Sequence, residues 1–340
     1  MSDFDLREFQ IFMTAPKPAL RDYVRHFVFF LIAFVTVTIA GTLYPFGILP
    51  IFANVGPEVS ATDFALHFPA YYAQMIGQTV MLMFREPEVL AYGLKFSISL
   101  LFVLLCHEFG HYFACRRYGV DSTLPYFIPT PPLLGPAGTF GAFIKIRSPL
   151  PSRRATFDIG VAGPIAGFVA LLPIAVTAFA TFQSSPEPLP AEMPEGLLVF
   201  SDPLIFHGLA FLFGIDLSVP MLPNPFYSAA WLGLLITALN LIPSGQLDGG
   251  HAVFAVFGPQ FHHWLGRAAF IAMLALSLAG LFFFNSPAGI LFAVLMGFLL
   301  RFKHPVPLEN EPLGNVRIAV AVLTLIIFVL SFVPFPIRIT

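Results

Sequence analysis

One short segment, His107-Glu108-Phe109-Gly110-His111, places two imidazoles and a carboxylate in the pattern H-E-x-x-H. Four residues are close to one helical turn, so on a helix His107 and His111 project from the same face and can share one Zn²⁺ ion. Glu108 follows the first of these directly, where it can take a proton from a water molecule at the metal. The segment therefore predicts metal-dependent hydrolysis.

A catalytic zinc ion takes three protein ligands and keeps one position for water, so a third ligand must come from elsewhere. The candidate segment is 240–251, N-L-I-P-S-G-Q-L-D-G-G-H, in which a proline and three glycines interrupt an apolar stretch. Irregular backbone at membrane depth is tolerated only where it is buried in protein or lines a cavity. Asp248 offers a carboxylate on this break and is the preferred ligand. His251, one turn further on, is the rival ligand or else a packing residue.

The composition indicates what positions these residues. Of the 340 residues 57% are hydrophobic and 11% are charged, whereas about 25% of a soluble domain is charged. This excludes an ordinary soluble protein, and it excludes disorder because disordered chains are polar and highly charged. The formal net charge of −2 comes without a basic stripe, which predicts no nucleic-acid partner.

The hydropathy pattern predicts an all-α polytopic membrane protein with about seven transmembrane helices. Each apolar stretch is near the ~20 residues that a span needs. The predicted spans are 27–49, 91–115, 157–182, 227–243, 265–284, 286–302 and 317–335. Two further segments, 66–83 and 203–215, are too short or too polar to span and are predicted to be interfacial or re-entrant.

The distribution of lysine and arginine predicts the orientation. These residues precede the first and third spans and follow the second and sixth, and none occurs between Arg154 and Arg267. With the basic loops in the cytoplasm, His107 and His111 lie roughly 8–14 Å inside the membrane from the cytoplasmic surface. Ionisable residues at that depth are costly and functional by default. We expect a prokaryotic cell membrane, with an organelle membrane as the alternative, and an active site near the cytoplasmic side.

The two motifs together resemble the site-2 protease family of intramembrane zinc metalloproteases. H-E-F-G-H on one span and N-L-I-P-S-G-Q-L-D-G-G on a later one match in order and membrane setting, over about 91–258. The resemblance implies one zinc ion per chain, held by His107, His111 and Asp248, with Glu108 as catalytic base. It implies that Asn240 lies near the catalytic centre, where it can bond to the tetrahedral intermediate, and that the substrates are transmembrane proteins. Many family members carry a PDZ or CBS domain, and we expect neither in these 340 residues.

The same resemblance divides the chain into an N-terminal segment, 1–90, a three-helix catalytic core, 91–258, and C-terminal transmembrane helices, 259–340. Within the core, Ala162 to Gly167 resembles the family's small-xxx-small element, for which close helix packing is a sufficient explanation. Residues 125–147 resemble the family's re-entrant loop and strand region. A small β-hairpin there can pair with an unwound substrate by β-augmentation, or it can simply seal the site.

The predicted function is regulated intramembrane proteolysis, and three alternatives are open to test. The first is a membrane transporter or metal carrier that uses the His and Asp cluster as an ion site. The second is an inactive homologue that acts as a scaffold, although a scaffold has no need of these costly residues. The third is a prenyl-protein protease type, whose third ligand is usually glutamate. Every glutamate after Glu108 lies in a predicted loop, which favours the site-2 type.

Overall fold

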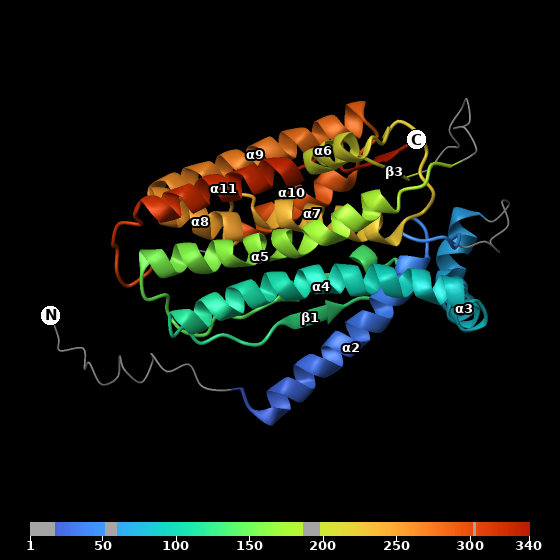
Figure 1. The fold of residues 1–340 in the computed structure, drawn as a ribbon, viewed down its shortest axis with the longest axis horizontal. Helices are drawn as coiled ribbons and strands as arrows, with labels where there is room; N and C mark the ends of the chain where they lie inside the picture. Colours follow the sequence, from blue (N-terminus) through green and yellow to red (C-terminus); the bar gives the residue numbers. More distant parts are fainter. Residues whose placement is uncertain (1–17, 52–59, 186–197, 302–303) are drawn as a thin grey trace.

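The computed structural model describes residues 18–51, 60–185, 198–301 and 304–340. Its long helices run side by side along the long axis of the molecule, with α2 tilted against them and α3 at one end (Figure 1). In chain order the elements are α2 (Leu20–Thr42), α3 (Ala61–Arg85), α4 (Pro87–Arg117), β1 (Tyr126–Pro129), the 3-10 turn η1 (Pro136–Gly138), β2 (Thr139–Phe143), α5 (Arg153–Ala180), β3 (Leu198–Phe200), α6 (Leu204–Phe213), α7 (Pro225–Asn240), α8 (Asp248–Phe257), α9 (Pro259–Phe283), α10 (Ala288–Leu299), α11 (Asn315–Ser331) and β4 (Ile337–Ile339). The described chain is thus mostly helical, as predicted.

Every predicted span corresponds to a helix, but the helices differ in length. In the described ranges, four are long and apolar enough to cross a membrane, namely α2, α4, α5 and α9. Helices α7, α10 and α11 have 16, 12 and 17 residues. The two segments predicted not to span form α3 and α6. The described structure is therefore mostly helical with four candidate membrane-spanning helices, and the number seven stays a prediction.

Helix α4 carries the H-E-x-x-H motif, and its ends are defined by local chemistry. It begins with Pro87, whose missing N–H is not needed in the first turn. Glu88 lies in that turn, and Arg116 and Arg117 lie in the last one, so the charges complement the helix dipole. Between these ends most residues are apolar, and the helix is continuous over 31 residues.

Helix α5 is the central element of the core and packs against α4, α7 and α8. It begins after Ser152, whose side chain accepts a hydrogen bond from the backbone N–H of Ala155. Small residues allow close approach: a Cβ on Gly110 of α4 would overlap the backbone of Ala162 in α5. Backbones that approach this closely gain packing energy that lipid cannot supply.

Two small antiparallel sheets complete the described structure. Strands β1 and β2 form the expected hairpin, with Tyr126 opposite Phe143. The hydroxyl of Thr36 in α2 donates to the carbonyl of Gly138 at 2.7 Å, which ties the hairpin to that helix. Strands β3 and β4 pair across more than a hundred residues of chain. The sequence does not predict this second sheet because each strand has only three residues.

Candidate metal centre

Helix α4 presents the three residues of the motif toward the interior of the bundle. His107, Glu108 and His111 are 5%, 6% and 7% exposed. The Nε2 atoms of the two imidazoles lie 3.1 Å apart, as expected for residues one turn apart on one helix face. The backbone carbonyl of Ile159 in α5 accepts a hydrogen bond from Nδ1 of His111 at 2.7 Å. That bond orients the ring and leaves Nε2 as a free electron-pair donor.

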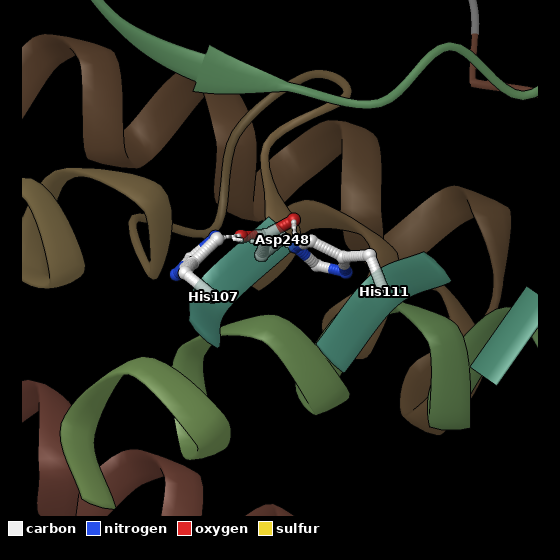
Figure 2. Close-up of side chains that lie close together, drawn as sticks. All are labelled: His107, His111 and Asp248. Atoms are coloured by element: carbon white, nitrogen blue, oxygen red, sulfur yellow. Dashed lines mark hydrogen bonds and ion pairs between the residues drawn. The ribbon is translucent and has the colours of Figure 1, made fainter. Parts of the chain in front are cut away.

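Asp248 reaches the same point from the helix break. Helix α7 ends at Asn240 and α8 begins at Asp248, so the carboxylate lies at the first residue of a new helix. Gly249 allows this turn, because a Cβ there would overlap the carbonyl group of Leu241. The two carboxylate oxygens of Asp248 lie 3.2 Å from Nε2 of His107 and 3.3 Å from Nε2 of His111. Figure 2 shows Asp248 between the two imidazoles.

The donor set fits a zinc ion. One ligand atom from each of His107, His111 and Asp248 lies within 4.8 Å of the other two. Two imidazole nitrogens and a carboxylate oxygen are ligands that catalytic zinc takes, with a fourth position left open. In the described parts of the chain no other group of three His, Cys, Asp or Glu residues converges in this way.

Helix α5 shapes the space around both imidazoles. The sequence alone did not predict this role of the helix. A Cβ on Gly163 would overlap the ring of His111, and a Cβ on Gly167 would lie 3.1 Å from Cβ of His107. These glycines therefore make room for the metal-binding rings as well as for helix packing. Their four-residue spacing was the available signal, but it does not tell which neighbouring side chain they face.

The cluster opens into a cavity of about 620 Å³. A carboxylate oxygen of Glu108 lies 4.0 Å from Nε2 of His107, and Nδ2 of Asn240 lies 3.4 Å from the same atom. Strand β2 contributes Ala142 and Phe143 to the wall, and it passes over the site in Figure 2. The cavity thus joins the metal centre, a carboxylate and an amide beside the hairpin.

His251, the rival ligand, also lines this cavity but is not part of the converging group. Its ring lies edge-on to His304, with 4.6 Å between the ring centroids. The structure therefore groups Asp248, and not His251, with the two histidines of α4.

Comparison with known proteins identifies the family. The sequence profile of Peptidase family M50 matches residues 95–284, which is more than half of the chain and contains every residue of the centre. The chain belongs to Peptidase family M50. This is the site-2 protease family that the two motifs resemble, so that prediction is confirmed.

Curated relatives of this M50 chain carry matching names. It is 32% identical over 271 residues to "Probable zinc metalloprotease EGY2, chloroplastic" of Oryza sativa subsp. indica. The aligned region covers 74% of this chain and 45% of that relative. It is 35% identical over 199 residues to "Probable zinc metalloprotease EGY1, chloroplastic" of Arabidopsis thaliana, covering 55% of this chain and 34% of the relative. The chain thus spans about half or less of the length of these relatives. Their names agree with the zinc-compatible donor set.

Proposed function

We propose that this M50 chain is a zinc metalloprotease that hydrolyses peptide bonds within or near the transmembrane segments of membrane-protein substrates. The observation that carries the proposal is the convergence of two imidazole nitrogens and one carboxylate oxygen beside Glu108, in a bundle of apolar helices. The names of the relatives support the same activity. They disfavour the alternative of an ion carrier that uses this cluster for transport.

The proposed roles follow from the positions of the side chains. His107, His111 and Asp248 would hold the zinc ion. When bound, zinc supplies Lewis-acid chemistry that polarises a carbonyl group and makes water more acidic. Glu108 lines the cavity, where its carboxylate takes a proton from the attacking water and returns it to the nitrogen of the leaving amine. The amide of Asn240 is close enough to the centre to donate a hydrogen bond to the oxygen of the reacting carbonyl.

The substrate must unwind before it can react, because a helix hides its peptide bonds in internal hydrogen bonds. Strand β2 pairs only with β1 among the described residues, so its second edge has no partner strand. Ala142 and Phe143 of this strand, and Ile144 directly after it, line the cavity. We therefore favour pairing of the unwound segment with β2, which would place a substrate backbone beside Glu108. A hairpin that only seals the site remains the competing hypothesis.

The membrane arrangement is part of this proposal. It has seven spans, with the catalytic core 91–258 between an N-terminal unit, 1–90, and C-terminal helices, 259–340. Arginines at the end of α4 support a site near the cytoplasmic surface. We keep a prokaryotic cell membrane as the host, and the chloroplastic location named for the relatives makes an organelle membrane the second candidate.

The test is zinc content together with cleavage of a single-span reporter by the purified chain. The wild type should bind about one zinc per chain and cleave. Glu108→Gln should keep the metal and lose cleavage, whereas Asp248→Ala should weaken both. Glu88→Gln, an exposed glutamate at the start of the same helix, is the matched control and should behave like the wild type. Cleavage by Glu108→Gln at the wild-type rate would show that the assignment of the base is wrong.

A further inference from the structure

A second polar cavity lies at the start of α2, outside the metal centre. It measures about 470 Å³ and is lined by Arg21, Asp22, Arg25 and Arg147. That volume is within the range of small-ligand pockets. Three guanidinium groups here face one carboxylate, so the cavity has an excess of positive charge.

The arginines are only partly neutralised by the protein. Arg25 lies 3.3 Å from Asp22 and over the ring of Tyr126, with 5.6 Å to the ring centroid. No ion pair joins the side chain of Arg21 or of Arg147 to any residue in the described ranges. The backbone of the segment that carries Arg147 is held in place, since the N–H of Arg147 donates to the main-chain carbonyl of Asp121 at 2.8 Å. The cavity therefore offers three guanidinium groups to an anion, and that of Arg25 is positioned by Asp22 and Tyr126.

The surface of α2 beside this cavity is apolar and uncovered. Beyond the first turn, Val24 and Phe27 are 55% and 59% exposed, and Leu31 is 44% exposed. Helix α2 is long and apolar enough to cross a membrane, and in that arrangement its first turn would lie at the level of the lipid headgroups. A ligand seated on the arginines would thus have room for apolar chains along the helix, which a free inorganic anion does not need.

We propose that the cavity of Arg21, Arg25 and Arg147 binds the phosphate headgroup of an anionic membrane phospholipid, whose acyl chains lie along α2. Guanidinium groups bind phosphate through paired hydrogen bonds, and arginine is well suited to this geometry. Basic pockets beside transmembrane helices are a known form of headgroup site. The positive excess favours a lipid with net negative charge over a zwitterionic one. This proposal is independent of the proteolytic activity.

The test is native mass spectrometry of the purified full chain, titrated in detergent with phosphatidylglycerol or with phosphatidylcholine. The wild type should bind phosphatidylglycerol more tightly. A single Arg147→Gln change should weaken that binding about fivefold, and the triple change Arg21→Gln, Arg25→Gln, Arg147→Gln by about 100-fold. The control is a second triple change that removes the same charge from exposed positions, Arg117→Gln, Arg267→Gln and Arg301→Gln. Unchanged zinc content would show that the variants are folded.

Three outcomes would overturn the proposal. Equal losses in the two triple variants would show that general surface charge attracts the lipid. Equal binding of phosphatidylcholine and phosphatidylglycerol would remove the argument from charge. Displacement of the lipid by inorganic phosphate or by a polyglutamate peptide, at concentrations similar to that of the lipid, would assign the cavity to a soluble anion or an acidic peptide.

Discussion

Replacement of Gly163 by alanine tests how the metal centre is positioned. The added Cβ would overlap the imidazole of His111, so the ring must move away from α5. Movement breaks its hydrogen bond to the carbonyl of Ile159, a loss of about 1 kcal/mol. Overpacking adds about 1–3 kcal/mol. The sum of about 2–4 kcal/mol corresponds to zinc binding that is about 30-fold to 700-fold weaker, at about 1.4 kcal/mol for each factor of ten.

The assay is competition for zinc between the purified chain and a chromogenic chelator. The control is Gly208→Ala in α6, where a Cβ would meet no atom within 4 Å. That change should leave zinc affinity unaltered and stabilise its helix by about 0.5–1 kcal/mol. Cleavage of the reporter should fall together with zinc occupancy in Gly163→Ala. If this variant binds zinc as tightly as the Gly208→Ala control, the space that α5 leaves for His111 does not position the ligand, and our reasoning is refuted.

Two further predictions concern residues away from the ligands. The guanidinium of Arg153 donates to the carbonyls of Ala255 and Val256 at the end of α8, the helix that begins with Asp248. Arg153→Met should therefore loosen α8 and weaken zinc binding about tenfold. The control Arg154→Met should leave zinc binding unchanged. Equal losses of zinc affinity in the two variants, measured in the chelator assay, would contradict the prediction. Burial raises the pKa of the Asp202 carboxyl above its usual range, so the stability from this group is present at low pH and is lost as pH rises through the raised pKa. Asp202→Asn should flatten this dependence when Tm is measured from about pH 4 to neutral, and an unchanged slope would show that Asp202 does not cause it.

Features that depend on neighbours along the chain could be predicted from the sequence. The spacing of His107 and His111 placed both imidazoles on one helix face, because the helical period is a local property. Long apolar runs in the sequence predicted the four long helices α2, α4, α5 and α9. The proline and glycines after Asn240 predicted the helix break, since these residues disrupt helical hydrogen bonding and helix propensity wherever they occur.

The tertiary structure alone decided which faces meet. The approach of Asp248 to the two histidines depends on α7 and α8 packing against α5, and the position of Gly163 beneath His111 depends on the contact of α5 with α4. The pairing of β3 with β4 likewise joins segments that are distant in the chain. A periodic pattern identifies the buried face of a helix but not the partner of that face, because the partner is selected by the fit of side chains over the whole bundle.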